Sequence, residues 1–174
     1  MPATIRLRQS LWRVISPKWA LDPLSGMGAA RNGGRWNRPG VQALYMSVEM
    51  DNAFAEYHQD IQRPGTVCRY DVDIGPVVDL RDVHSLRAIG ATQAELICAW
   101  KMIHLVERKT PPNWRIADQL TATGVSGSLV PSVQRQGGTN LVLWRWNDDA
   151  SRKVAAYDPQ GDLPRNQASW IGPP

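Results

Sequence analysis

The chain has 174 residues, of which 43% are hydrophobic and 21% charged, values typical of a globular protein with its own core. No apolar window approaches the length of a membrane span, and residues 1–15 carry arginines without the apolar run of a secretory signal. These features argue against membrane binding and secretion. We expect one cytoplasmic domain over residues 1–174.

The formal net charge of +4 fits a solvated basic surface, a nucleic-acid interface, or a basic pocket for a phosphate-bearing small molecule. The basic residues form no run and no single helical stripe. Direct nucleic-acid binding is therefore not expected, although a basic nucleic-acid-binding module stays the non-enzymatic alternative. Cys68 and Cys98 lack the spacing of a metal or disulfide site, and the three histidines are scattered, so no metal is expected.

The first half of the chain predicts two strands and a helix around a loop. Leu11–Ile15 is expected to form a short strand, and Ser25–Gly40 a loop because it is rich in glycine. A second strand is predicted over Ala43–Ser47. Ser47 would then cap a helix that reaches about Asp60.

The middle of the chain predicts strands followed by helices. Val67–Ile74 alternates apolar and polar residues, which indicates a half-buried antiparallel strand, and Val77–Leu80 is expected to form a separate short strand. A capping box of Thr92 and Glu95 opens a predicted helix that runs through Val106 and stops before Pro111.

The last part predicts one helix and three strands. The helix covers Pro112–Thr123, and the strands cover Ser128–Val133, Asn140–Trp146 and Lys153–Tyr157. Residues 158–174 are rich in Pro, Gly and Asn and are expected to form an irregular arm. Strands and helices mix without strict alternation, so we predict an α+β fold with mostly antiparallel sheets and flanking helices.

The glycine-rich segment Ser25–Gly40 carries the most chemical information. It is neither a Walker loop, because no G-K-[ST] follows, nor a dinucleotide fingerprint, because Arg31 replaces the third glycine. Its three arginines suit a diphosphate, since guanidinium groups bind phosphate oxygens in pairs. Gly34 would let the backbone approach a ligand, and Trp36 would line its pocket. A flexible surface loop is the alternative.

Two further residues are candidates for chemistry. Glu56 lies on the flank of the predicted helix, where a carboxylate can face a pocket, although a solvated glutamate is the commoner case. Ser132 follows a proline on a strand, and no G-x-S-x-G elbow surrounds it. We therefore expect Ser132 to orient a ligand, and not to attack one.

The order of these segments resembles the RES-domain family, which is named for conserved arginine, glutamate and serine residues. The matching segments are L-W-R (Leu11–Arg13), S-G-x-G-A (Ser25–Ala29), G-G-R-W-N-x-P-G (Gly33–Gly40), L-Y-x-S (Leu44–Ser47), A-x-x-E (Ala53–Glu56), L-V-P-S (Leu129–Ser132), N-L-V-L (Asn140–Leu143) and L-P-x-N-x-x-S-W (Leu163–Trp170). Together they span nearly the whole chain, and G-G-R-W-N is the most specific of them.

The resemblance implies a fold related to ADP-ribosyltransferases. It also implies a toxin that acts on NAD as its substrate and pairs with an antitoxin carrying a helix-turn-helix DNA-binding domain. Members of the family degrade NAD by hydrolysis or phosphorolysis, and one branch ADP-ribosylates phosphoribosyl pyrophosphate synthetase. The acceptor of ADP-ribose in this chain stays open: water, phosphate or a protein.

The resemblance also assigns roles by position. The catalytic residues would be Glu56, Arg13 and Ser132, and the NAD-binding residues Arg13, Arg35, Tyr45 and Ser132. Gly34 and Trp36, from the glycine-rich segment itself, complete the predicted NAD-binding residues. Nicotinamide leaves NAD as a neutral molecule, so one carboxylate suffices where ordinary glycoside cleavage uses two. Glu56 would stabilise the sugar cation, and Arg13 and Arg35 would bind the diphosphate.

Overall fold

The computed structural model describes residues 1–59 and 62–166. Within these residues, six strands form one mixed sheet: β1 (Thr4–Ile15), β2 (Leu44–Ser47), β3 (Thr66–Asp79), β4 (Gly127–Pro131), β5 (Thr139–Leu143) and β6 (Arg152–Ala156). The order is β1-β2-β5-β4-β3-β6, and β1 also pairs with β3. That extra pairing closes five of the strands into a ring. The prediction of a mostly antiparallel α+β fold is confirmed, since only β3 and β4 pair in parallel.

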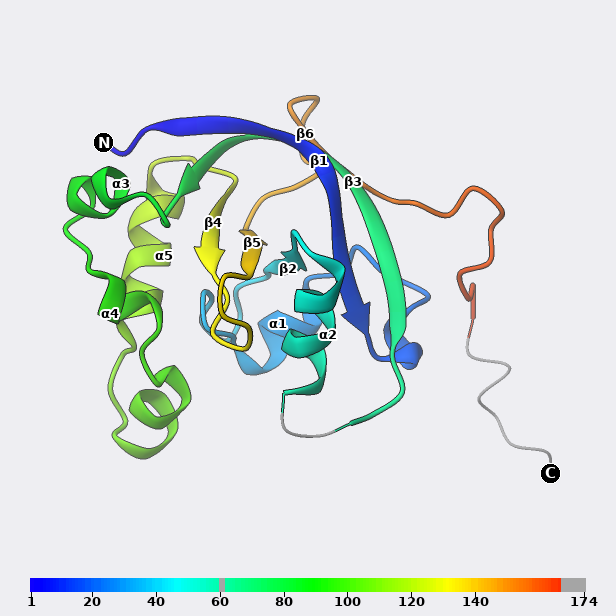
Figure 1. Ribbon diagram of the computed structural model, residues 1–174, viewed down its shortest axis with the longest axis horizontal. Coiled ribbons are helices and arrows are strands. Elements are labelled where there is room, and N and C mark those ends of the chain that lie inside the picture. The colour runs from blue at the N-terminus through cyan, green and yellow to red at the C-terminus, as the bar shows by residue number, and fades with distance from the viewer. Residues whose placement is uncertain (60–61, 167–174) are drawn as a thin grey trace.

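A long antiparallel ribbon of β1 and β3 arches over the shorter strands (Figure 1). Leu11 lies opposite Tyr70 and Arg13 opposite Cys68 in its register. In β3 up to Ile74, the buried residues are those that alternate in the sequence, Cys68, Tyr70, Val72 and Ile74, as the pattern predicts.

The short sheet of β2, β5 and β4 separates two hydrophobic cores. Leu44 and its cross-strand partner Leu143 face the ribbon and join the first core. The next pair, Tyr45 and Val142, faces the second core, which α5 and the α3 region cover. Successive side chains of a strand point to opposite faces, so this small sheet can divide the interior in this way.

The helices lie on both sides of this sheet (Figure 1). Their bounds are η1 (Pro17–Trp19), α1 (Met27–Asn32), α2 (Met50–His58), α3 (Val83–Ala88), α4 (Gln93–Leu96), the π-helical turn η2 (Met102–Val106) and α5 (Pro112–Ala122). Helix α2 packs against β1 through Ala53 and Tyr57, which form a small apolar cluster with Val14. The capping box at α4 is present as predicted, and α5 matches its predicted range to within one residue.

Several predicted boundaries in the first half are wrong. The expected loop Ser25–Gly40 contains α1, because Ala29 and Ala30 favour a helix there despite the surrounding glycines. Strand β1 begins at Thr4 and not at Leu11, because its polar first half pairs with β3 and needs no apolar face. Helix α2 ends at His58, and the predicted end near Asp60 and the residue after it lie outside the described residues.

Ser47 does not cap α2. The N-cap residue is Glu49, without a side-chain cap, and the Ser47 hydroxyl donates instead to Asn140 Oδ1 at 2.7 Å. The strand β2 ends at Ser47, so its side chain still belongs to the sheet and points at the neighbouring strand β5. This bond becomes part of the candidate site.

The predicted strands Val67–Ile74 and Val77–Leu80 are one strand, β3. The Gly75–Pro76 pair does not end it, because the register with β1 shifts there and both residues fit opposite a single residue of β1. After this bulge β3 also pairs with β4.

The predicted helix from Thr92 to Val106 is broken after Leu96. The carbonyl of Leu96 accepts from the side chains of Asn113 and Arg35 instead of from a further helical turn, and only the short η2 follows. Helix α3 was not predicted, although Asp82 supplies a recognisable N-cap by accepting from the Ser85 amide.

The last three strands are shifted from their predicted ranges. β4 and β5 both end earlier than predicted, at Pro131 and Leu143, and β6 begins and ends one residue earlier. The chain after β6 has no regular structure through residue 166, in agreement with the predicted arm, whose residues 167–174 lie outside the described part. The prediction of a single domain over residues 1–174 stays a prediction.

Candidate active site

Glu56 lies on the last turn of α2, where the packing of the helix decides its direction. Ala53 and Tyr57 bury one side of α2 against β1, and the Tyr57 hydroxyl donates to the Pro64 carbonyl at 2.6 Å. Glu56 is half-buried and turns to the ends of β4 and β5. A carboxylate at the border of a core helix can thus face a site formed by the neighbouring strands.

One oxygen of this carboxylate is held by two side chains. Glu56 Oε1 accepts from Ser132 Oγ at 2.7 Å and from Asn140 Nδ2 at 2.6 Å. Ser132 follows β4, and its Oγ also accepts from the backbone amides of Gln134 and Arg135 at 3.2 and 3.1 Å. The serine hydroxyl therefore has a fixed direction and donates its only proton to Glu56.

Asn140 is a site residue that sequence reasoning missed. It stands near the start of β5, and its Oδ1 accepts from Ser47 Oγ at 2.7 Å and from Asn52 Nδ2 at 2.9 Å. Ser47 and Asn52 are both buried. In the sequence, the signal for Asn140 was that a polar residue begins the apolar N-L-V-L segment.

Arg35 is near enough to this carboxylate for the two charges to interact. Its Nη1 donates to the carbonyl of Cys98 at 2.7 Å and, more weakly, to that of Leu96 at 3.4 Å. Burial lowers the pKa of Arg35 below its usual value, and the nearby charges of Cys98, Glu56 and Tyr45 oppose this shift. The guanidinium is thus hydrogen-bonded to the end of α4 and the segment that follows it, within range of the Glu56 charge.

Tyr45 and the glycine-rich segment are joined through the tyrosine hydroxyl. Tyr45 donates to Asn37 Oδ1 at 2.6 Å and accepts from the Trp36 amide at 3.0 Å. Burial raises the pKa of Tyr45 above its ordinary value. A Cβ on Gly34 would lie 2.6 Å from this hydroxyl, so glycine is needed there for packing against Tyr45.

Trp36 lies in the second core, with only 2% of its surface exposed. Its backbone carbonyl accepts from the indole of Trp144 at 2.8 Å. The NAD contacts of Trp36, Tyr45 and Gly34 stay predictions, and the structure gives each of them a packing role as well.

Arg13 lies apart from this group. On β1 it is opposite Cys68, whereas Val14 and Trp12 pack toward α2. Arg13 Nη1 donates to the Pro23 carbonyl at 3.3 Å, and among residues 1–59 and 62–166 no hydrogen bond or ion pair joins it to Glu56. The structure therefore joins Glu56 to Ser132 by a hydrogen bond and places Arg35 within range of the Glu56 charge, and it leaves the catalytic role of Arg13 a prediction.

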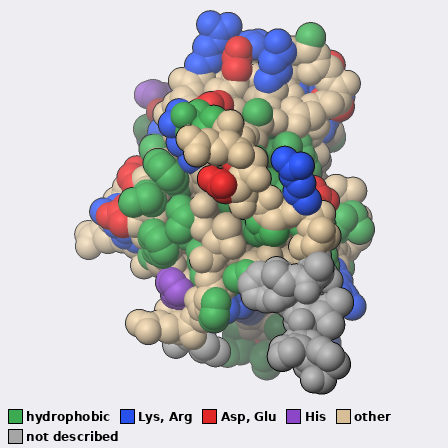
Figure 2. Space-filling view, turned by 90° about the vertical axis from the view of Figure 1, so that its right-hand side faces the viewer, with side chains coloured by type: hydrophobic (Ala, Val, Ile, Leu, Met, Phe, Trp, Pro, Cys, Tyr) green, Lys and Arg blue, Asp and Glu red, His purple; other side chains and the backbone are tan. Residues whose placement is uncertain are grey.

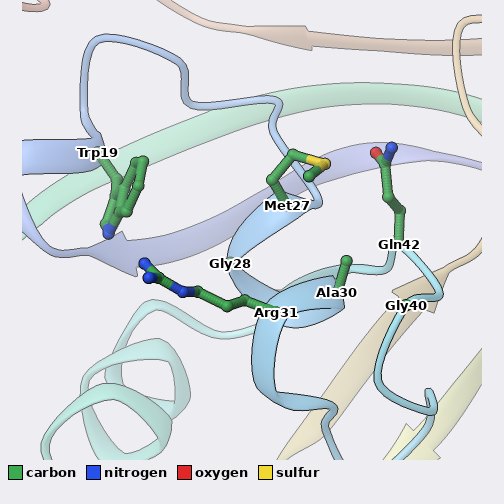
Figure 3. Close-up of a pocket in the computed structure, with 7 residues that line it drawn as sticks. All are labelled: Trp19, Met27, Gly28, Ala30, Arg31, Gly40 and Gln42. Carbon is green, nitrogen blue, oxygen red and sulfur yellow. The ribbon is translucent and has the colours of Figure 1, made fainter.

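The other two arginines of the glycine-rich segment point elsewhere. Arg38 forms a salt bridge with Asp118 of α5 at 2.6 Å and lies over the Trp114 ring. Arg31 lines a pocket of about 510 Å³, where its side chain extends toward Trp19 (Figure 3). The three arginines do not form one cluster.

Two hollows flank α1. The pocket in Figure 3 is lined by Trp19, Met27, Gly28, Ala30, Arg31, Gly40 and Gln42. A second, more open hollow of about 740 Å³ shares Met27, Gly40 and Gln42 with it and continues to Trp144 and Trp146. Neither is lined by Glu56 or Ser132, so the site around the carboxylate is a separate place in the fold.

The comparisons with known proteins give the family. The family model described as the RES domain matches residues 10–166. The chain belongs to the RES-domain family. No curated protein matches it.

One solved structure supports the fold of this RES-domain protein. A chain of the crystal structure of the M. tuberculosis MbcT–MbcA toxin–antitoxin complex matches with a TM-score of 0.62 and 20% sequence identity. The match covers 90% of this chain and 87% of that chain. At this identity the likeness shows the fold, and the mixed α+β architecture described above agrees with it.

The described residues offer neither a metal-binding cluster nor a membrane-spanning helix. Residues 1–59 and 62–166 hold no group of three or more His, Cys, Asp or Glu side chains placed to bind a metal ion. In the same part of the chain, no helix has the length and apolar character needed to span a bilayer.

Proposed function

We propose that this RES-domain protein is the toxin of a toxin–antitoxin pair and cleaves the bond between nicotinamide and ribose in NAD. The observation that carries the proposal is the half-buried Glu56 carboxylate, fixed through one oxygen by Ser132 and Asn140. Membership of the RES-domain family supports it.

The proposed reaction needs a single carboxylate. The bond between ribose C1′ and the pyridinium nitrogen breaks, and its electron pair leaves with nicotinamide, which becomes neutral. The acceptor oxygen then bonds to C1′ and releases its proton to solvent. Glu56 stabilises the positive charge that develops on the ribose, and no general acid is required for the leaving group.

The remaining residues would bind and orient NAD. Arg35 carries the charge suited to a diphosphate, and Arg13 is the second candidate for that contact. Tyr45 would line the nicotinamide or ribose subsite, and Ser132 would keep the carboxylate in place while it orients the substrate. No metal takes part in this scheme.

The acceptor of ADP-ribose is either water, phosphate or a protein side chain. One observation favours a protein: the segment after α4 reaches the site through the Arg35 bond to Cys98. That segment exposes Ile97, Met102, Leu105 and Val106 to solvent. An exposed apolar surface beside the site suits transfer to a protein target such as phosphoribosyl pyrophosphate synthetase.

The proposed partner is an antitoxin with a helix-turn-helix DNA-binding domain, and the proposed location is the cytoplasm. The likeness to a chain of a toxin–antitoxin complex supports the pairing. A nucleic-acid-binding module has less support, because Arg6 and Arg8 both contact Asp73 and Arg69 contacts Asp71. Figure 2 shows acidic side chains among the basic ones on one face of the molecule.

The test is the release of nicotinamide from NAD by the purified chain. We expect Glu56→Gln, which keeps the shape but removes the charge, to lower the rate by about 10²–10³-fold. Glu107→Gln is the matched control, because Glu107 pairs on the surface with Lys109 and should keep the full rate. Labelled NAD added to a cell lysate separates the acceptors: free ADP-ribose or its phosphate indicates degradation, and one labelled protein indicates transfer. Full activity of Glu56→Gln would contradict the assignment.

A further inference from the structure

The amide of Asn140 has one orientation that satisfies all its neighbours. Its Oδ1 accepts from Ser47 and Asn52, and its Nδ2 donates to Glu56. A flipped amide would place its oxygen against the carboxylate and its NH₂ group against the NH₂ group of Asn52. The hydrogen bonds that Ser47 and Asn52 donate to Asn140 Oδ1 therefore turn the NH₂ group of Asn140 to Glu56.

Those two donors are held by the fold. Ser47 is the last residue of β2, and Asn52 lies in the first turn of α2 with no exposed surface. Asn52 Nδ2 also donates to the Thr139 carbonyl at 3.3 Å. Gly138 makes room for this side chain, since a Cβ there would lie 2.6 Å from Asn52 Oδ1.

The two oxygens of the Glu56 carboxylate differ in their hydrogen bonds. Oε1 takes both hydrogen bonds, from Ser132 and from Asn140. Among the residues that the structure describes, no side chain hydrogen-bonds Oε2. Within the described residues, side chains thus fix the carboxylate through one oxygen only.

We propose that Asn140 is a positioning residue for Glu56, and that Ser47 and Asn52 set the direction of its amide. The inference rests on the proposed function, in which Glu56 faces the ribose of NAD. Asn140 acts through Glu56, so its loss affects the rate of cleavage more than the binding of NAD. The bond between a neutral amide and a charged carboxylate belongs to the stronger class of hydrogen bonds.

The experiment is a double-mutant cycle on nicotinamide release from NAD. We expect Asn140→Ala to lower kcat by about 10–100-fold, the effect of one hydrogen bond to a charged group, with KM changed by less than about threefold. Ser47→Ala is expected to lower kcat less. The double variant should be no slower than Asn140→Ala, because Ser47 acts only through Asn140. Ser10→Ala, a partly exposed serine of β1 that donates to Asp71, is the control.

Three results would overturn the proposal. They are an unchanged kcat in Asn140→Ala, losses in the two single variants that simply multiply, or a rise in KM without a fall in kcat. Asn140→Asp keeps the size of the side chain and guards against a packing artefact. It removes the N–H group and adds a like charge, so it should be at least as slow as Asn140→Ala.

A readout without NAD separates this inference from the proposed function. The rate of the unmodified chain tests NAD cleavage, whereas the side-chain amide signals of Asn140 in ¹⁵N–¹H NMR test the contact itself. We expect these signals to move in both Glu56→Gln and Ser47→Ala. Unmoved signals would overturn the positioning role whether or not NAD is the substrate.

Discussion

At the scale of single residues, the sequence is informative about charge and less informative about neutral polar side chains. Glu56 and Ser132 could be chosen from the resemblance, and the structure joins them directly. Asn140 and Asn52 were not chosen, because an amide in a strand or a helix is compatible with many roles. Only the three-dimensional contacts show that they hold the carboxylate.

Gly34 gives a prediction at this scale. A methyl group there would lie 2.6 Å from both the Tyr45 hydroxyl and Asn37 Oδ1, so Gly34→Ala should destabilise the fold by about 1–3 kcal/mol. Urea denaturation measures this cost. Gly28→Ala is the control: its Cβ meets nothing within 4 Å in helix α1, so it should be neutral or stabilising by about 0.5–1 kcal/mol.

A second variant identifies the contact that demands glycine at position 34. In a Tyr45→Phe background the hydroxyl is absent, so Gly34→Ala should cost less than in the unmodified chain. An equal cost in both backgrounds would mean that Tyr45 is not the neighbour that matters.

At the scale of elements, the C-terminal end of α4 shows how side chains replace helical hydrogen bonds. The Leu96 carbonyl accepts from Asn113 Nδ2 at 2.9 Å and from Arg35, and the Cys98 thiol donates to Asn113 Oδ1 at 2.7 Å. These bonds end the helix, although the apolar residues that follow predict its continuation. Local periodicity carries no information about such distant partners.

Asn113→Ala is the prediction at this scale. Asn113 is fully buried in the first turn of α5, so its removal leaves the Leu96 carbonyl and the Cys98 thiol each with one partner fewer. We expect a loss of about 1–3 kcal/mol in the free energy of unfolding and faster amide exchange over residues 97–106. Gln93→Ala, exposed on α4, should change neither quantity. Unchanged exchange in Asn113→Ala would show that other contacts hold this segment.

At the scale of the whole molecule, the sequence predicted the fold class and most elements but not how the sheet closes. Val67–Ile74 was recognised as a half-buried strand, because its alternation is local. Its continuation past Gly75 and Pro76 was missed, because that continuation depends on pairing with β1 and β4. The closure of the ring follows from those long-range pairings, which no local pattern encodes.

The stability of the protein is also expected to depend on pH, through a charged pair at the end of β3. Burial raises the pKa of Asp79, but hydrogen bonds from Arg81 outweigh this and hold the pKa of that carboxyl below its usual value. Arg81 also donates to Thr139 Oγ1 at 2.9 Å, so the pair connects the end of β3 to the start of β5. A carboxyl with a lowered folded-state pKa stabilises the fold above its unfolded pKa, and this contribution is lost as pH falls through the folded value.

Arg81→Gln should therefore destabilise the protein at pH 7 and much less in acid. Both side chains are partly exposed, so the expected cost at pH 7 is about 0.5–1 kcal/mol. Urea denaturation of both proteins between pH 7 and pH 3 measures the difference, which should shrink as Asp79 becomes protonated. Arg87→Gln, an exposed residue at the end of α3, is the control. A difference that stays constant with pH would show that Arg81 stabilises this junction through Thr139 and not through the charge of Asp79.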